Sequence, residues 1–303
     1  MRHSQRRPAA GQQPLQRWTH IAAVVSAITG VVALFYAGLS FGASQQQARA
    51  VANGQISARL AAATENLTAE GAASREAAIG ELGRIAHESP RHQPEAMTLL
   101  ASFVRRQTRP TGPLGRPACL DQALPADVAT ALTVIGARDP SHDGDVPINL
   151  SSSCLNHAGL NGANLTCVNL DASHLEDANL ERAILLGTWL SGARMAGANL
   201  YEAKLNHARM DHAIFYTARK EGALLERADL SDTILTDADV RWSYLGEADL
   251  VRTQIVGANF RGSDLTGAGL ATYLDGADFS DAVGVNRSAA LRRMPTPRPG
   301  PCD

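Results

Sequence analysis

The residues that could support chemistry in this chain are its histidines and its paired carboxylates. His207 and His212, in "NHARMDHAIF", are five residues apart, and we interpret them as solvated surface side chains in preference to metal ligands. Asp229 and Asp249 are twenty apart with Arg209 twenty before the first, which predicts a column of surface charge and not an acid–base pair. Phosphate-binding loops, nucleophile elbows and zinc-protease motifs do not occur in the sequence. We therefore expect no enzyme, no cofactor and no metal.

The composition narrows the class of protein. Of 303 residues, 45% are hydrophobic, 19% are charged and only 5% are aromatic, and the formal net charge is −2. That balance argues against nucleic acid as a partner and against a disordered chain. Because large side chains are scarce, we expect a thin, regular core.

The N-terminus predicts a membrane anchor. A basic segment, residues 1–18, precedes the apolar stretch "IAAVVSAITGVVALFYAGLSF" at residues 21–41. At about 1.5 Å per residue this stretch covers roughly 30 Å, the thickness of the hydrocarbon layer. We expect a transmembrane helix over residues 19–42; the alternative, a cleaved signal, would have a shorter apolar stretch. The excess of arginines before the span favours a single-pass protein of the cell membrane with a cytoplasmic N-terminus, and leaves the side of the remaining chain open.

Residues 46–139 show helical periodicity. Ile79, Leu82 and Ile85 share one face, and Pro90 ends that helix because proline lacks the backbone N–H. The stripes of three further helices contain Ile56, Leu60, Ala63 and Leu67; Met97, Leu100 and Val104; and Val128, Leu132 and Ile135. We expect short helices that pack together and cover the start of the region that follows.

From Ile148 to Leu270 the sequence repeats every five residues. When the third member of each pentad is taken as its centre, 24 of the 25 centres are Leu, Met, Phe, Ile or Val. The residue two before the centre is Ala in 16 of the 25 pentads, and the residue directly before it is often Asn or Asp.

Neither regular element buries such a series on one side. Five residues advance an α-helix by about 500°, and on a strand an odd step sends successive leucines to opposite faces. A chain that turns by a fixed amount after each pentad would point every centre at a common axis. A short fixed period is also typical of solenoids.

The pentads "AGANL", "ERADL", "GEADL" and "RGSDL" resemble the A(D/N)LXX signature of the pentapeptide-repeat family. The resemblance implies a mainly β fold, a right-handed quadrilateral β-helix over residues 148–280 with four pentads to a coil. The stretch "GRIAHESPRHQPEAMTLLASFVRR" is similar to the helical part of membrane-tethered bacterial members. We thus expect a transmembrane helix, a small α-helical region, the β-helix, and a C-terminal cap with a flexible tail at residues 281–303.

One centre breaks the rule. In "YTARKEGALL", Lys220 stands where leucine belongs, in the inferred stack of Leu200, Lys220 and Val240. A bare ammonium group inside the tube would cost several kcal/mol. We expect the wall to open there or the side chain to reach outward, and we prefer a local defect to the alternative of a binding site. After Leu270 the register slips by one residue.

Four cysteines are present. In the four-sided fold, Cys154 and Cys167 face outward from opposite walls of one coil, and a disulfide needs Cα atoms within about 7 Å. This pair is therefore not expected to join. Cys119 and Cys302 are left as partners that no spacing favours, so we predict neither a disulfide framework nor a zinc site.

Two functions are consistent with a rod-shaped β-helix of this kind. The first is a scaffold that is anchored in the lipid bilayer by residues 21–41 and binds an unknown protein partner. Its candidate surface consists of outward apolar residues, with Ile214 and Ile234 expected to stack on one wall, Leu224 and Tyr244 on another, and Tyr216 and Trp242 near them. The second is a DNA mimic that protects topoisomerases, as in quinolone resistance, and it needs a uniformly acidic rod. Between Asp171 and Asp281 there are 18 acidic and ten basic residues. The rod is therefore not uniformly acidic, which favours the first function. The sequence leaves undecided whether the protein forms a homo-oligomer.

Overall fold

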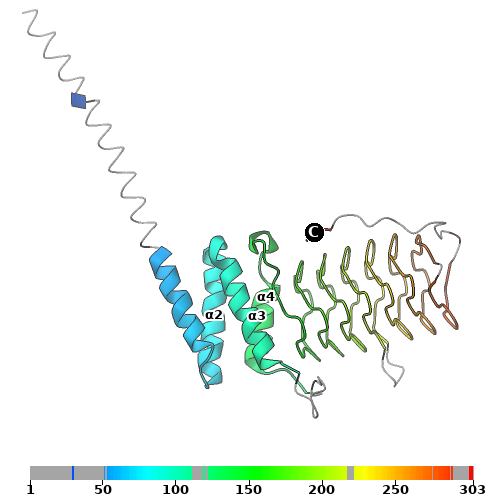
Figure 1. The fold of residues 1–303 in the computed structure, drawn as a ribbon, viewed down its shortest axis with the longest axis horizontal. Coiled ribbons are helices and arrows are strands. Elements are labelled where there is room, and N and C mark those ends of the chain that lie inside the picture. The colour runs from blue at the N-terminus through cyan, green and yellow to red at the C-terminus, as the bar shows by residue number, and fades with distance from the viewer. Residues whose placement is uncertain are drawn as a thin grey trace, which may run out of the picture. The chain divides into compact units, whose positions relative to one another are not determined.

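The computed structural model describes residues 29–30, 51, 53–110, 119, 122–216, 222–274, 276–286, 288 and 300–302. The chain divides into two compact units, residues 1–58 and 59–303. In the second unit, α-helices are followed by a stack of coils (Figure 1). Of the predicted membrane span only Thr29 and Gly30 are described, and both are helical. Among the described residues, no helix combines the length and the apolar character needed to cross a membrane.

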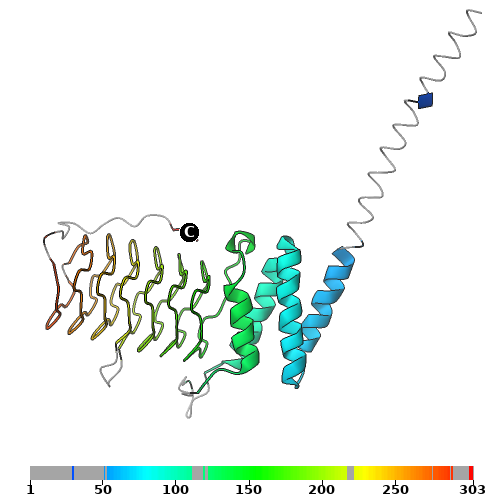
Figure 2. The ribbon, with the colours of Figure 1, turned by 180° about the vertical axis from the view of Figure 1, so that it is seen from behind.

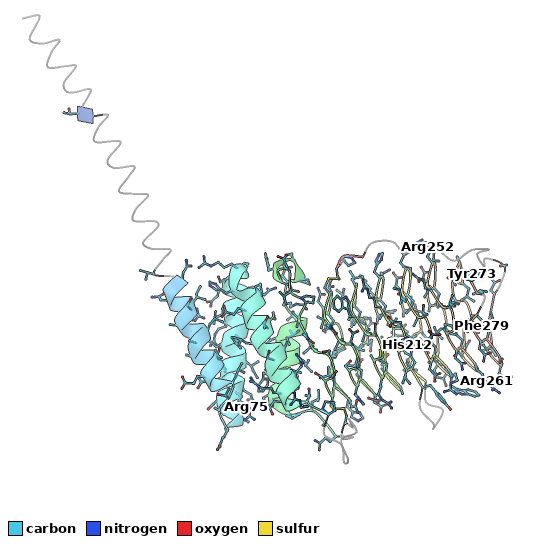
Figure 3. The ribbon with its side chains drawn as sticks, viewed as in Figure 1. Arg75, His212, Arg252, Arg261, Tyr273 and Phe279 are labelled. Atoms are coloured by element: carbon cyan, nitrogen blue, oxygen red, sulfur yellow. A yellow bond between two sulfur atoms is a disulfide. The ribbon has the colours of Figure 1, made fainter. Side chains whose placement is uncertain are left out.

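Among its described residues, the helical part has three α-helices and two 3-10 turns, besides the helical residues 53–66. They are α2 (Ala72–Glu88), η1 (Pro90–His92), α3 (Gln93–Gln107), α4 (Ala126–Gly136) and η3 (Pro140–His142). The predicted stripe residues of α2, α3 and α4 are all buried, since they face the neighbouring helices. Arg75 of α2, labelled in Figure 3, donates from Nε to Asp127 Oδ2 of α4 at 2.6 Å. Asp127 is buried, so this ion pair fixes α4 against α2.

The repeat region forms a β-helix with four walls. Parallel bridges join residues that are twenty apart, such as Asn149 with Asn169 and His174 with Arg194. Because the pentad is one wall, twenty residues make one coil of four walls. The coils stack one behind another beyond α4, and the reverse view shows the same order (Figure 2).

The four walls are named by their outward bridging residues. Wall 1 carries Asn149, Asn169, Trp189, Arg209, Ile234 and Gln254. Wall 2 carries Cys154, His174, Arg194, Ile214, Asp239, Asn259 and Asp278. Wall 3 carries Gly159, Asn179, Asn199, Leu224, Tyr244, Asp264 and Val283. Wall 4 carries Asn164, Ile184, Lys204, Asp229, Asp249 and Gly269.

Each position of the pentad has a physical role. The centres and the small residues two before them fill the tube, and Leu175 and Ala178, for example, are fully buried. Where the small residue is threonine, its hydroxyl donates a hydrogen bond to a backbone carbonyl of the preceding coil, as Thr188 Oγ1 does to Leu165 O (2.8 Å). The Asn or Asp before the centre accepts a bond from the amide two residues on, as Asp249 Oδ1 does from Val251 N (2.9 Å). This Asx turn starts the corner and explains the preference for Asn and Asp.

The wall is interrupted at the pentad that contains Lys220. Asn199 pairs with Leu224, which is 25 residues away instead of twenty, and Tyr216 and Gly222 form an antiparallel bridge. The pairing of the flanking residues thus leaves five extra residues, 217–221, between successive rungs; these five, Lys220 among them, lie outside the described residues. The predicted opening of the wall at Lys220 therefore stays a prediction, but the inferred stack is wrong. Leu200 N donates to Leu224 O, so Leu225 is the centre that follows Leu200.

The helices close the first coil, as predicted. The amides of Cys154 and Asn164 have no preceding coil to bond with, and they donate to Thr108 O and Gly136 O, each at 2.8 Å. These carbonyls lie at the C-terminal ends of α3 and α4, where carbonyl groups lack helical partners. The amides at the open edge of the first coil and the carbonyls at the ends of two helices are thus hydrogen-bonded to each other, so this edge of the β-helix is not left unpaired there.

Arg138 fastens the same junction. Its buried guanidinium donates to Asn164 O (2.5 Å) and Thr166 O (2.8 Å) of the first coil. It also pairs with Asp143 at 2.7 Å, and Asp143 Oδ1 accepts from Gln93 Nε2 of α3 at 2.9 Å. One charged network therefore connects α3, the end of α4 and wall 4.

The cysteines correct the sequence prediction. Cys119 is bonded to Cys154 and Cys167 to Cys302, so a disulfide framework exists where none was predicted. Cys154 and Cys167 are not joined to each other, as expected. Cys302 is thereby attached to Cys167 at the end of the first coil, while most of the predicted flexible tail lies outside the described residues. Gly187, one coil above Cys167 and at φ +60°, makes room for it: a Cβ there would overlap Cys302 Sγ.

The register slip after Leu270 is confirmed at the far end. Asn259 pairs with Asp278 and Asp264 with Val283, so the last coil is one residue shorter. The rings of Phe260 and Phe279 stack there with centroids 5.1 Å apart, and Figure 3 labels Phe279 in this coil. The C-terminal cap and tail predicted at residues 281–303 fall mostly outside the described residues.

Candidate functional site

The two residues predicted to stack on one wall do so. Leu224 and Tyr244 are bridge partners on wall 3, and they are 37% and 51% exposed. Val283 lies two coils beyond Tyr244 on the same wall and is 55% exposed, with Asp264 between them. Val283 was missed because it lies after the register slip, where the sequence repeat no longer marks the walls.

Tyr216 and Trp242 extend this surface around the corner between walls 2 and 3. The Arg241 guanidinium lies over the Tyr216 ring, 4.3 Å from its centroid, and pairs with Asp239 at 2.6 Å. That pairing, which outweighs the desolvation of the group, raises the pKa of Arg241 above its ordinary value. The Trp242 ring occupies space that a Cβ on Gly262 would need. We name Leu224, Tyr244, Val283, Tyr216 and Trp242 the wall-3 patch.

Ile214 and Ile234 do not belong to this patch, and the prediction that they stack on each other is wrong. Ile214 lies on wall 2 between Arg194 and Asp239. Ile234 lies on wall 1, opposite wall 3, with Arg209 below it. The inserted pentad shifts every later residue by one wall relative to the twenty-residue expectation.

The other candidates for chemistry are separate surface residues. His207 and His212 occupy corner positions at successive walls, with φ of 61° and 57°; Figure 3 labels His212. Asp229 and Asp249 are bridge partners, as predicted, but Lys204 lies below Asp229 where Arg209 was expected. Among the described residues, no three His, Cys, Asp or Glu side chains are grouped so that they could hold a metal ion.

Many carboxylates are paired with an arginine of an adjacent coil. Along the corner after wall 3, Glu202 accepts from Arg182 at 2.8 Å and from Arg227 at 2.9 Å, and Arg227 lies 3.7 Å from Glu247. The hydrogen bond from Arg182 lowers the pKa of Glu202 below its usual range. Two further pairs across coils, Arg252 with Asp232 and Arg261 with Asp281, contain arginines labelled in Figure 3. The surface is therefore an alternation of charges and not a uniformly acidic one.

Comparison with known protein families identifies the same five-residue repeat that the sequence shows. The family described as pentapeptide repeats matches in 8 copies, over residues 148–182, 185–215, 221–250 and 233–270. Among curated proteins, none matches the sequence significantly.

Solved structures of pentapeptide repeat proteins are similar to part of the chain. One from the thylakoid lumen of Arabidopsis thaliana is 26% identical, with a TM-score of 0.27, over 33% of this chain and 63% of its own. QnrB1, a plasmid-mediated fluoroquinolone resistance protein, is 19% identical, with a TM-score of 0.33, over 45% of this chain and 75% of its own. HetL from the cyanobacterium Nostoc sp. strain PCC 7120 is 26% identical, with a TM-score of 0.18, over 47% and 75%.

The family match and the four-walled geometry coincide on the same residues. The match starts at residue 148, where the first wall begins, and ends at residue 270, where the register slips. The helical part and the C-terminal tail lie outside it. The pentapeptide-repeat family therefore matches the repeat region of this chain, residues 148–270.

Proposed function

We propose that this protein is a membrane-anchored scaffold that binds a protein partner through the wall-3 patch and has no catalytic activity. The observation that carries the proposal is the exposure of Leu224, Tyr244 and Val283 on one wall of a narrow tube. Elsewhere in the β-helix the described large apolar side chains are turned inward or partly covered. An exposed apolar row with aromatic residues beside it is typical of a binding surface.

The wall gives such a patch a fixed shape. Leu224 and Tyr244 are held by backbone bonds on both sides, from Leu224 N to Ala198 O (2.9 Å) and from Leu225 N to Tyr244 O (2.7 Å). A partner would therefore pay little ordering entropy on this protein's side. Tyrosine and tryptophan supply large contact areas with few rotatable bonds, which suits the centre of an interface.

The two disulfides support an extracytoplasmic position for the repeat region. Disulfides persist in oxidising compartments and are rare in the cytosol. The pairs Cys119–Cys154 and Cys167–Cys302 use every cysteine of the chain. Together with the arginine excess before residues 21–41, this favours an anchor whose N-terminus is cytoplasmic and whose repeat region is outside.

The DNA-mimic alternative is less well supported. Such a mimic needs a dense row of unpaired negative charge, because charge is what it copies from the phosphate backbone. Here the alternating ladder of Arg182, Glu202, Arg227 and Glu247 neutralises one corner along its length. A supercoiling assay with gyrase separates the two functions, since a scaffold leaves quinolone inhibition unchanged.

Site-specific photo-crosslinking tests the scaffold. A photoreactive phenylalanine analogue replaces Tyr244 in the full-length protein in its native membrane, and Gln254 on the opposite wall serves as the matched control position. We expect crosslinked species from position 244 that are absent from position 254 and that disappear when Trp242→Ala and Leu224→Ala are added. Identical crosslinking patterns at the two positions would exclude the wall-3 patch.

A further inference from the structure

A groove lies where α3 meets wall 2. Its volume is about 970 Å³, and it is open to solvent. The lining comes from two sides: Ser102, Arg105, Arg106, Arg109 and Pro110 from α3 and its exit, and Ser151, Ser152, Ala172, His174, Gly192, Arg194 and Ile214 from the coils. Five of these twelve side chains are arginine or histidine, and none is a carboxylate.

The floor of the groove is a regular column. Cys154, His174, Arg194 and Ile214 are consecutive bridge partners on wall 2, so they follow one another at about 4.8 Å. The column starts where α3 is fixed to the tube, through the bond from Cys154 N to Thr108 O at 2.8 Å. The Cys119–Cys154 disulfide is attached to the same rung. The two sides of the groove are therefore held in place by covalent and backbone bonds.

The arginines on the helix side have no ion-pair partner among the described residues. Arg105, Arg106 and Arg109 are exposed, and none has an ion pair or side-chain hydrogen bond with any described residue. Basic residues in the last turn of a helix favour its negative end, which accounts for Arg105 and Arg106 locally. That effect does not account for Arg109, which lies beyond the helix, or for the basic residues that face it from wall 2.

The wall side is partly neutralised. Arg194 pairs with Glu176 at 2.6 Å, and His174 Nδ1 lies 3.5 Å from the same carboxylate. Asp171 and Asp211 lie along the neighbouring corner, where Ser191 is bonded to both: its amide to Asp171 Oδ1 and its hydroxyl to Asp211 Oδ1. The excess positive charge is thus confined to the helix side, and acidic residues border it.

These features select among anions. A long nucleic acid would meet the bordering carboxylates, and no aromatic side chain lines the groove to stack on bases. A free phosphate would need an enclosed site, whereas this volume is at the upper end of the roughly 300–1,000 Å³ of small-molecule pockets. Several carboxylates spread along a short segment match three separate guanidinium groups, because arginine binds carboxylates through paired N–H donors. Ile214 offers an apolar contact at the far end of the column.

We propose that this groove binds a short acidic peptide segment of a partner protein, with carboxylates on Arg105, Arg106 and Arg109 and an apolar side chain on Ile214. The groove and the wall-3 patch share no residue.

Fluorescence anisotropy on the full-length protein in detergent tests the proposal. The probe is a labelled six-residue peptide with four glutamates and two leucines, and the comparison probe has glutamine in place of glutamate. We expect saturable binding of the acidic probe, which weakens as salt is added, and at least tenfold weaker binding of the glutamine probe. The Arg105→Gln, Arg106→Gln, Arg109→Gln triple variant should bind the acidic probe at least tenfold more weakly.

The control is Arg91→Gln, which removes an exposed arginine on η1 that also lacks a described partner. It should bind like the unaltered protein, and an unchanged melting temperature of the triple variant shows that its fold is intact. Equal binding by the triple variant and by the Arg91→Gln variant would overturn the site. Equally tight, arginine-dependent binding of inorganic phosphate or of vesicles containing an anionic phospholipid would overturn the assignment to an acidic peptide.

Discussion

Arg138 shows how one side chain joins the two halves of the second unit. Its side chain is 1% exposed, and that of Asp143 is 12% exposed. Replacing Arg138 with alanine leaves the largely buried Asp143 carboxylate without its cationic partner and two carbonyl groups of the first coil without donors. We expect Arg138→Ala to lower the free energy of unfolding by about 3–5 kcal/mol, measured by denaturant titration. Arg84→Ala, which removes an arginine that is 64% exposed, should change it by less than about 0.5 kcal/mol. Equal effects of the two substitutions would show that the Arg138 network does not stabilise the junction between the helices and the first coil.

Glu176 makes stability depend on acid pH. Burial raises its pKa, but the nearby His174 ring and the hydrogen bond from Arg194 act against burial, and the net result lies below the ordinary 4.5. Folding therefore favours the ionised carboxyl, so its contribution is complete above about pH 4.5 and is lost as the pH falls through the lower folded value. We expect Glu176→Gln to cost on the order of 1 kcal/mol at pH 7, with a difference that shrinks in acid. Unfolding curves at a series of pH values check this, and a constant difference would contradict it.

At the scale of the element, the inserted pentad is removable. If residues 217–221 are deleted, Tyr216 is followed by Gly222, and the sequence across the junction is Phe215, Tyr216, Gly222, Ala223, Leu224, Leu225. This is a regular pentad in which glycine takes the corner position that has positive φ throughout the tube. We expect the deletion variant to keep its β-type circular dichroism and to melt no lower than the unaltered protein. A melting temperature lowered by several degrees would show that the loop stabilises the coil.

The insertion also explains what the sequence could and could not predict. The period of five survives an insertion of five residues, so the inward centres and the small residues were predicted correctly on both sides of Lys220. The number of pentads per coil changes locally from four to five, and nothing in the period records that. Leu224 and Tyr244 were placed correctly because both follow the loop, whereas Ile214 and Ile234 lie on either side of it.

The disulfides and the groove were not predicted, because they join segments that no local pattern relates. Cys167 and Cys302 are 135 residues apart, and their pairing depends on where the tail returns. The one local sign is Gly187, which stands twenty residues after Cys167 and leaves space for a sulfur atom. The arginines of α3 were visible in sequence, but their proximity to His174 and Arg194 required the docking of that helix on wall 2.

For the whole molecule, the two ends of the solenoid are closed differently. The first coil is bonded to helix ends and to Cys119, whereas the last coil is followed by a tail in which Cys302 is attached to Cys167 of the first coil. From Asn286 to Cys302 the sixteen residues can span up to about 55 Å. The rungs of wall 3 from Gly159 to Val283, which run from the first coil to the last, cover only about 29 Å at 4.8 Å per coil. The tail therefore has slack and cannot hold the last coil under tension.

This slack decides how the Cys167–Cys302 disulfide stabilises the protein. Closing a loop of 135 residues restricts the unfolded chain and is worth about 5 kcal/mol in the chain-entropy treatment, while local opening of the last coil is left free. We expect the Cys167→Ser, Cys302→Ser pair to lose about that much in global unfolding. Amides of the last coil, such as Gly262 N bonded to Ser280 O, should exchange hydrogen at their former rate if they open locally.

The Cys119→Ser, Cys154→Ser pair is the matched control. It opens a loop of 35 residues, for which the same treatment gives about 4 kcal/mol, and it frees a segment fixed directly to the first coil. Local exchange should therefore quicken at Cys154 and its neighbours in this variant. If the Cys167→Ser, Cys302→Ser variant instead shows fast exchange confined to the last coil with unchanged global stability, the tail acts as a taut clamp, and the unfolded-state explanation is wrong.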